Sequence, residues 1–289
     1  MFEVTVAEDT VFNGKRITTL VAKYPRIIHA EVLTHRSFCR NASSSRAIPV
    51  RRMIADVEAD PFYPLWWGLN QKGMKMQDEE ANIGACRNQW KISLNAALMA
   101  AKDLSGNLNV HKSLVNRLLE PFSYITCLIT ATEWANFFRL RIHEDADPHM
   151  HKLAAMMLEA IERSTPVERP LHLPFLWPNE QRYVVRSYLS KGVHDATVAD
   201  WAYVSAARCA RVSYLTHDKR RDTVADRELA MRLISGSGFG HWSPFEHFAI
   251  SYCGIDTKCP YRGWRTFRAT QLNENMPGHA EEYKCLKKS

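Results

Sequence analysis

Apolar and polar residues at the start of the chain are arranged in a way that predicts a β-hairpin. The segments Phe2 to Val6 and Arg16 to Tyr24 are rich in Val, Thr and Ile, which favour strands. Between them stands Asn13-Gly14, a dipeptide typical of the tight turn that joins two antiparallel strands. We therefore expect the chain to open with two paired strands.

Farther along the chain, apolar residues recur at every third or fourth position, which is the spacing of an amphipathic helix. A long helix is expected over Glu79 to Leu104, with apolar positions at Ile83, Cys86, Trp90, Leu94, Ala97, Ala101 and Leu104. A shorter helix is expected over Met150 to Glu162. Together with the strands, these patterns predict a mixed α/β fold.

A proline-rich stretch separates two parts of the chain. Ser164 to Gly192 contains Pro166, Pro170, Pro174 and Pro178, and such punctuation predicts an irregular connector. We expect a first part over residues 1–163, a connector over 164–200, and a last part over 201–289 that completes the same fold. The 289 residues suit one large domain or two small ones.

Composition is that of a globular protein, with 46% hydrophobic and 24% charged residues. No apolar run approaches the roughly 18 residues of a membrane span, and Met1 to Val4 does not begin a basic, apolar secretory segment. The seven cysteines are odd in number and scattered, which fits a reducing compartment better than a disulfide framework. We expect a cytoplasmic protein with no membrane partner.

The net charge of +7 indicates an anionic partner, and both nucleotides and nucleic acids qualify. The basic residues cluster at Arg36 to Arg52 and Tyr261 to Arg268. A protein that binds duplex DNA more often has a recognition helix or a lysine-rich tail, and the only tail here is Lys284, Lys287 and Lys288. Nucleic acid is therefore the less favoured partner.

Residues Thr34 to Arg46 have the composition of an anion-binding segment. They include three arginines, a histidine, an asparagine and three consecutive serines. Guanidinium groups bind phosphate bidentately, and hydroxyl groups satisfy the remaining oxygens. A phosphorylated ligand is expected, and the alternative is a solvated basic turn, because charged runs usually face water.

The same segment resembles the signature of the flavin-dependent thymidylate synthases. That signature reads Arg-His-Arg-x7-Ser, and this chain has His35-Arg36, seven residues, Ser44 and then Arg46, with Thr34 in place of the first arginine. In that family the segment binds FAD on one side and the phosphate and ribose of dUMP on the other.

Other segments resemble further parts of the family pattern. Ala206 to Ser213 and Gly240 to His247 are similar to its Ala-Arg-Val-Ser and Gly-His-x-Thr/Ser-Pro-Phe-Glu-His blocks. The resemblance also implies a charged helix between these blocks, roughly over Asp222 to Ile234. Asn116 to Pro121 and Asn136 to Arg141 are similar to its Arg-x-x-x-Pro turn and its Leu-Arg segment for uracil.

The order of these blocks differs from that of short family members, in which the Pro-Phe-Glu-His block precedes the signature. The helix that normally leads into the signature is represented twice, by Ile27 to Arg36 and by Pro260 to Arg268. This arrangement resembles the longer, phage-type members. The resemblance therefore implies an antiparallel sheet with flanking helices and with permuted, partly duplicated elements.

The activity implied by the resemblance is transfer of a one-carbon unit from 5,10-methylenetetrahydrofolate to C5 of dUMP, giving dTMP, with FAD reduced by NADPH. Family members form homotetramers, so a homo-oligomer is expected. For the substrate the implied residues are Ser44, Arg46, Arg117 and Arg141. For FAD they are His35, Arg36, Asn41, Asn136, Ser213, His241 and Ser243. Arg141 and His241 are the expected catalytic residues, and no metal is expected.

Two further functions stay open at this point. One is a related enzyme that methylates or hydroxymethylates dUMP or dCMP for viral DNA modification. Asp147 motivates it, because family members often have Gln there and a carboxylate can accept a hydrogen bond from cytosine N4. The alternative role for Asp147 is that of N-cap of the helix that follows, with Pro148 in its first turn. The other function is a nonenzymatic basic protein that binds nucleotides or nucleic acid.

Three local features have a structural and a functional interpretation. Cys39 stands near Arg36 and Arg40, which favours a thiolate nucleophile, but a buried inert cysteine is the preferred interpretation. Ser243 to Glu246 reads as a capping box that begins a helix, whose N-terminus could also bind a phosphate of FAD. His143 to His151 contains metal-binding residue types, but the spacing of His149 and His151 does not match a helical i, i+4 pair.

Overall fold

The structure is a computed structural model that describes residues 1–73, 80–214, 222–235, 241–254 and 260–270. Its centre is a five-stranded sheet in the order β3-β4-β2-β1-β5. The strands are β1 (Glu3–Phe12), β2 (Lys15–Pro25), β3 (Cys39–Ala42), β4 (Tyr124–Ala131) and β5 (Val167–Glu168). All neighbours are antiparallel except β1 and β5, which are parallel. The mixed α/β class is confirmed.

The predicted N-terminal hairpin is confirmed. Strands β1 and β2 pair from Glu3↔Lys23 to Phe12↔Lys15. The turn residues Asn13 and Gly14 have φ angles of 48° and 69°. Two consecutive left-handed residues match the right-handed twist of the flanking strands, which explains the Asn-Gly pair at this position.

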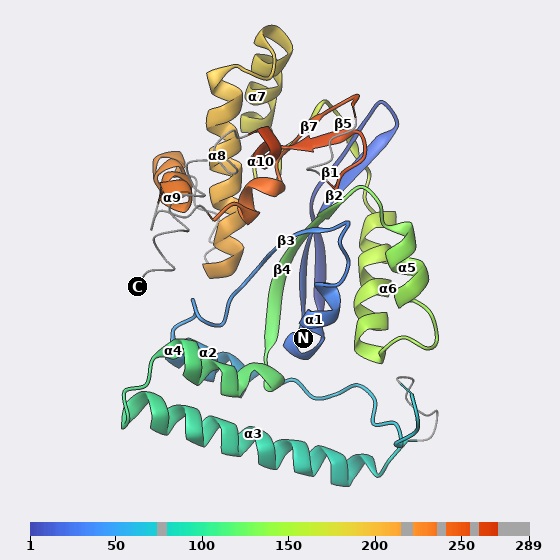
Figure 1. Cartoon of the computed structure of the whole chain (residues 1–289), viewed down its shortest axis with the longest axis vertical. Helices are drawn as coiled ribbons and strands as arrows, with labels where there is room; N and C mark the ends of the chain where they lie inside the picture. Colours follow the sequence, from blue (N-terminus) through green and yellow to red (C-terminus); the bar gives the residue numbers. More distant parts are fainter. Residues whose placement is uncertain (74–79, 215–221, 236–240, 255–259, 271–289) are drawn as a thin grey trace, which may run out of the picture.

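One face of the sheet is covered by α5 (Ala135–Arg141) and α6 (Pro148–Glu162), which lie beside it in Figure 1. Apolar side chains from alternate positions of β2 and β4, among them Leu20 and Ile129, share a core with Met157 of α6, and all three are fully buried. The alternation follows from the period of two along a strand. It leaves the other set of side chains on β2 and β4 for the opposite face.

The opposite face packs against the C-terminal half of the chain. That half contains β6 (Leu171–His172), α7 (Pro178–Lys191), α8 (Ala196–Ala210), η3 (Arg211–Tyr214), α9 (Thr223–Ser235), η5 (Ser243–Glu246), β7 (Ala249–Ser251), β8 (Trp264–Thr266) and α10 (Phe267–Thr270). Strands β6, β7 and β8 form a second, antiparallel sheet. Ile17 and Cys39 pack against Trp264, and Leu128 packs against Cys209 of α8.

A third group of helices lies at the far end of the sheet, as Figure 1 shows. It consists of α2 (Val50–Ala59), α3 (Ile83–Gly106), α4 (Lys112–Val115) and η2 (Asn116–Phe122). The short η1 (Arg26–Ile28) and α1 (His29–Val32) connect β2 to the segment before β3. The helices α3 and α6 agree with the two that the apolar spacing predicts, and α9 agrees with the charged helix that the family resemblance implies.

Two expectations about secondary structure are wrong. The stretch Ser164 to Gly192 is not irregular, because it contains β5, β6 and the 14-residue helix α7. Pro178 stands in the first turn of α7, where the missing N–H of proline costs nothing. The division at 164–200 remains a prediction, although β5 of that stretch pairs with β1 of the first part.

The second wrong expectation concerns the repeated helix at Pro260 to Arg268. Residues Trp264–Thr266 form β8, which pairs with β7, and only the single turn α10 follows. The indole of Trp264 is buried and donates to the carbonyl of Lys15 at 3.1 Å. Pairing and indole burial outweigh the weak local preference of so short a segment.

Within the described residues, no helix combines the length and apolar character needed to cross a membrane.

Candidate functional site

The segment after β3 is held in place from its inner side. Asn116 is fully buried, and its side-chain amide donates to the carbonyls of Ser45 at 2.7 Å and of Ile48 at 2.9 Å. The hydroxyl of Ser45 donates to Glu120 at 2.6 Å. These bonds fix the loop backbone, because buried polar groups are strongly disfavoured without partners. Ser44 and Arg46, the two neighbours of the buried Ser45, are left exposed.

Three of the expected substrate residues are thereby exposed to solvent, on the loop after β3 and at the start of η2, and these two segments bond to each other. Ser44 and Arg46 lie on the loop after β3, and the exposed Arg117 directly follows Asn116, the residue that bonds this loop. Among the described residues, neither guanidinium has a recorded acidic partner. Unpaired cations beside hydroxyl groups can bind a phosphate.

A second group of residues surrounds His35. Its ring lies between Phe38 and Phe137, with centroids 5.6 and 4.8 Å away. Arg141, at the end of α5, donates from Nε to Nε2 of His35 at 3.1 Å and lies 3.5 Å from the carboxylate of Glu31. Burial, followed by the charges of Arg141 and Arg40, lowers the pKa of His35. The imidazole is therefore neutral at pH 7 and accepts the bond from Arg141.

A third group joins β3 to the C-terminal half. The amide of Asn41 donates to the carbonyl of Cys209 at 3.0 Å, and its oxygen accepts from the hydroxyl of Ser243 at 3.3 Å. Asn41 is buried. Both ends of the amide are therefore engaged within the protein, and Asn41 fixes the relative positions of β3, α8 and η5.

The expected capping box at Ser243 to Glu246 is wrong. This segment is one 3₁₀ turn with Trp242 at its N-cap and no side-chain cap bond. Ser243 bonds Asn41, and Glu246 pairs with Arg268 at 2.7 Å. Burial raises the pKa of Glu246, while Arg268 lowers it. Because no longer helix starts here, the turn offers no helix dipole for a phosphate.

The other expected cofactor residues are not joined to these groups by a recorded side-chain bond among the described residues. Arg36 and His241 are exposed, and the exposed Asn136 accepts from Arg139 at 3.2 Å. The side chain of Ser213 lies outside the part of the chain that the structure describes, as does Gly240. The assignments of these residues remain predictions.

Asp147 is the N-cap of α6. Its Oδ1 accepts from the backbone amides of His149 at 2.9 Å and Met150 at 3.0 Å, and Pro148 stands in the first turn. The bonds with His149 and the two amides lower the pKa of Asp147 against the opposing effect of burial. The structural interpretation of this residue is therefore confirmed.

Cys39 is buried against Ile17 and Trp264, in agreement with the preferred interpretation. No group of three or more potential metal-binding side chains occurs in the described ranges.

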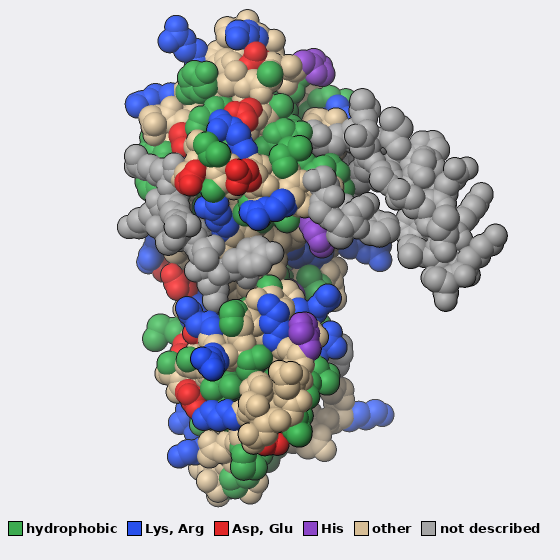
Figure 2. Space-filling model, turned by 90° about the vertical axis from the view of Figure 1, so that its left-hand side faces the viewer, with side chains coloured by type: hydrophobic (Ala, Val, Ile, Leu, Met, Phe, Trp, Pro, Cys, Tyr) green, Lys and Arg blue, Asp and Glu red, His purple; other side chains and the backbone are tan. Residues whose placement is uncertain are grey.

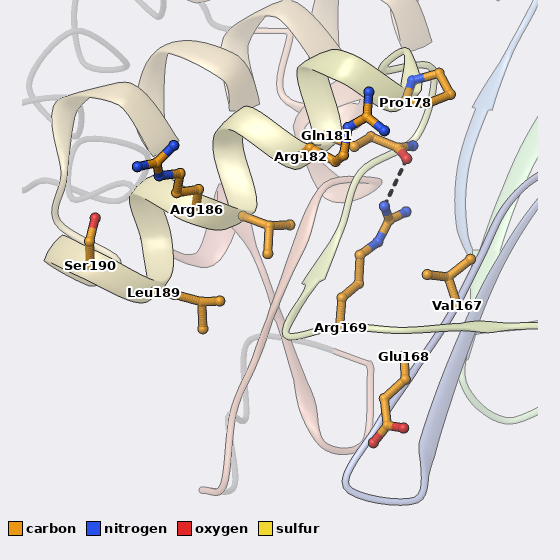
Figure 3. Close-up of a pocket in the computed structure, with 10 residues that line it drawn as sticks. Val167, Glu168, Arg169, Pro178, Gln181, Arg182, Arg186, Leu189 and Ser190 are labelled. Atoms are coloured by element: carbon orange, nitrogen blue, oxygen red, sulfur yellow. Dashed lines mark hydrogen bonds between the residues drawn. The ribbon is translucent and has the colours of Figure 1, made fainter.

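Two hollows were not foreseen from the sequence. One of about 240 Å³ is lined by Ser43 and Ile48 of the segment after β3 and by Arg52 and Tyr124, among others. A larger one of about 660 Å³ lies between β5 and α7. Figure 3 shows Arg169 reaching from the β5 side to Gln181 of α7, which it bonds at 2.8 Å. The i, i+4 spacing of Arg182 and Arg186 signalled a basic helix face, but only the fold shows what it faces.

The sequence matches no family model and no curated protein. Solved structures similar to part of the fold include a UMP/dUMP methylase PolB from Streptomyces cacaoi bound with 5-Br dUMP, which is 12% identical, has a TM-score of 0.46 and covers 56% of this chain and 90% of its own. They also include a flavin-dependent thymidylate synthase from Helicobacter pylori complexed with FAD and dUMP. It is 18% identical and has a TM-score of 0.35, and the match covers 60% of this chain and 72% of that chain. These similarities are partial, and the site is defined by the contacts of this chain itself.

Proposed function

We propose that the protein is a flavin-dependent enzyme that transfers a one-carbon unit to C5 of a pyrimidine deoxynucleotide, converting dUMP to dTMP. The observation that supports it most is the meeting of separate motif blocks. Arg141 bonds His35 across 106 positions, and Ser243 bonds Asn41 across 202 positions. Segments chosen only for their resemblance to one family are thus in contact in this chain.

For the nucleotide, the proposal assigns Ser44 and Arg46 to the phosphate and ribose, and Arg117 to the phosphate or the base. The backbone that carries them is fixed through Asn116 and Glu120, so this backbone needs little further ordering when an anion binds. Preorganisation of this kind lowers the entropic cost of binding.

For the base, the proposal assigns Arg141 as a fixed cation beside a pyrimidine carbonyl. The side chain is oriented by His35 and Glu31, which leaves it little freedom to turn away. A positioned cation stabilises negative charge that develops on the carbonyl when C5 reacts. Because Asp147 serves as a helix cap, we propose dUMP over dCMP as the substrate.

For the cofactor, the donors around the site suit the anionic and polar groups of FAD. His35, Arg36, Ser243 and His241 offer such donors or acceptors, and Asn41 positions β3 and η5 rather than binding directly. Bound FAD would supply redox chemistry that no side chain provides. We propose NADPH as its reductant and 5,10-methylenetetrahydrofolate as the one-carbon donor.

We further propose a homo-oligomer, a tetramer by the family resemblance. Exposed apolar side chains on α3, among them Met99 at 70% and Ile92 at 53% exposure, support an additional contact surface. Light scattering of the purified protein measures the subunit number.

The first experiment is the absorption spectrum of the purified protein with and without added FAD. We expect the spectrum of a bound oxidised flavin and, with reductant and folate, release of tritium from C5 of labelled dUMP. Arg141→Gln should abolish tritium release, Arg141→Lys should restore part of it, and the surface variant Arg163→Gln should match the wild type. A protein that binds neither FAD nor dUMP contradicts the proposal.

The nonenzymatic alternative has less support. On the face shown in Figure 2, Lys and Arg side chains are interspersed with acidic ones and do not form one continuous stripe. A nucleic-acid-binding surface is usually a basic patch or stripe. Tight binding of duplex DNA by a flavin-free protein would favour this alternative.

A further inference from the structure

A row of polar side chains is buried between the two halves of the molecule. Thr19 of β2 stands opposite Thr130 of β4 and opposite Glu8 of β1. These side chains therefore project from the same face of the sheet. His172 of β6 and His247, just after η5, reach the same row from the C-terminal half.

The row forms one uninterrupted chain of hydrogen bonds. Thr10 lies 3.3 Å from Glu8 and 2.9 Å from Nδ1 of His172. Nε2 of His172 lies 2.7 Å from Thr19, Thr19 lies 2.7 Å from Thr130, and Thr130 lies 2.7 Å from Nδ1 of His247. The two histidines and three threonines are fully buried, and Glu8 is 8% exposed.

The first member of the chain acts as an acceptor while its carboxylate is ionised. Burial raises the pKa of Glu8, and the charge and hydrogen bond of Arg169 oppose this rise. Arg169 donates to one oxygen of Glu8, and Gln181 donates to the other from Nε2 at 2.9 Å. Neither group can accept a proton from the carboxylate, because guanidinium and amide nitrogens only donate. Arg169 and Gln181 also line the hollow beside α7 (Figure 3).

The direction of every following bond can be derived from this end. Thr10 donates to the carboxylate, so its oxygen accepts from Nδ1–H of His172. Nε2 of His172 then accepts from Thr19, Thr19 accepts from Thr130, and Thr130 accepts from Nδ1–H of His247. Each hydroxyl has one proton and each neutral imidazole has one, so with Glu8 ionised no other assignment satisfies all five bonds.

Both histidines are neutral for a physical reason that is independent of this counting. Burial lowers the pKa of His172 well below its ordinary value and lowers that of His247 to about 3. Reversing all five bonds would require one additional proton, placed on Glu8. The charge of Glu8 therefore decides which of the two arrangements exists.

We infer that Glu8, Thr10, His172, Thr19 and Thr130 form a directional relay that holds His247 as the Nδ1–H tautomer. Nε2 of His247 is then a bare acceptor, and it has no partner among the described residues. A buried acceptor without a hydrogen bond costs free energy. We therefore propose that Nε2 of His247 accepts a hydrogen bond from the N–H or O–H group of a small ligand that binds at the Pro-Phe-Glu-His block. The relay members are positioning residues.

This inference deepens the proposed function, since His247 belongs to the block that carries Ser243. It does not depend on flavin or nucleotide, because the relay is defined by protein groups alone. Failure of the two can therefore be distinguished: the tautomer is measured on the full chain without ligand, and the flavin spectrum is measured separately.

The test is NMR of full-length protein with 15N-labelled histidine, in which the protonated and bare ring nitrogens have different shifts and couplings. His247→Asn identifies the signals of His247. We expect Nδ1–H for His247 in the wild type and in Thr19→Ser, which keeps the hydroxyl. Thr19→Val should move the proton to Nε2, because Thr130 loses its acceptor and becomes free to donate to Nδ1.

The matched control is Thr18→Val. Thr18 is fully buried and adjacent in sequence, but its hydroxyl bonds Asp9 at 2.9 Å and takes no part in the relay. This variant should lose stability as Thr19→Val does while keeping the Nδ1–H signal. An Nε2–H tautomer in the wild type, or no change in a folded Thr19→Val protein, would overturn the inference. If Thr19→Val does not fold, the wild-type tautomer decides alone.

Discussion

Replacing Arg208 by Met should destabilise the protein strongly, because Arg208 is the centre of a buried ion network. Its guanidinium donates to both oxygens of Glu180 at 2.6 and 3.0 Å, to Asp226 at 2.8 Å and to the carbonyl of Phe175 at 3.0 Å. Met has a similar apolar stem, so the variant removes the charge with little change in packing volume.

The expected magnitude follows from what remains after the substitution. Breaking a buried ion pair by removing one partner typically costs about 3–5 kcal/mol. Asp226 keeps Arg211 at 2.7 Å, and Glu180 keeps the backbone amide of Trp177 at 2.7 Å. Because both carboxylates retain one partner, we expect the lower end, about 3 kcal/mol in the free energy of unfolding.

The stability of the Arg208→Met variant should also depend on pH in a predictable direction. Burial already raises the pKa of Asp226, and Arg208 is the largest influence that lowers it. Without Arg208 this pKa should rise further in the folded state. Asp226 in the folded variant then binds a proton more readily than in the unfolded chain. The free energy of unfolding of the variant therefore decreases as the pH rises through the folded pKa of Asp226 and increases again as the pH falls.

The assay is denaturant unfolding followed by tryptophan fluorescence at neutral and mildly acidic pH. The matched control is Arg227→Met, because Arg227 also joins α9 to α8, through Asp200 at 2.6 Å, but the two side chains are 37% and 39% exposed. A half-exposed pair contributes at most about 1 kcal/mol. Equal losses for the two variants, or a loss for Arg208→Met that does not shrink at acidic pH, would refute the reasoning.

Three further predictions concern the candidate site. Arg46→Ala should weaken binding of dUMP by roughly 2–3 kcal/mol, the scale of a lost charged hydrogen bond, with FAD binding unchanged, and unchanged dUMP affinity in calorimetry would remove Arg46 from the site. Cys39→Ser should keep most of the activity because the thiol is buried, whereas a loss beyond about a thousandfold, roughly 4 kcal/mol in the barrier, with FAD still bound would point to a nucleophile. Asp147→Ala should cost about 1 kcal/mol of stability through the lost helix cap and leave the preference for dUMP over dCMP as it was, and a shift in that preference would place Asp147 at the base.

Local chemistry in the sequence was sufficient for the elements that depend on near neighbours. The Asn13-Gly14 turn requires two left-handed residues. Asn-Gly meets that requirement through its own backbone preference, whatever packs against the turn. The apolar spacing of α3 and α6 and the Asp147 cap are likewise properties of a single segment. The signature segment was recognisable because its arginines and serines lie within thirteen consecutive positions, Thr34 to Arg46.

Only the tertiary structure decided the features in which distant residues meet. Trp264–Thr266 form a strand because β7 lies beside them, whereas the family resemblance implied a helix over these residues. Asn41 was expected to bind FAD, but its amide is engaged by Cys209 and Ser243, 168 and 202 positions away. The relay from Glu8 to His247 spans both halves of the chain, and its members have no sequence pattern in common. Such contacts depend on which faces the sheet presents, and that is determined by packing rather than by any one segment.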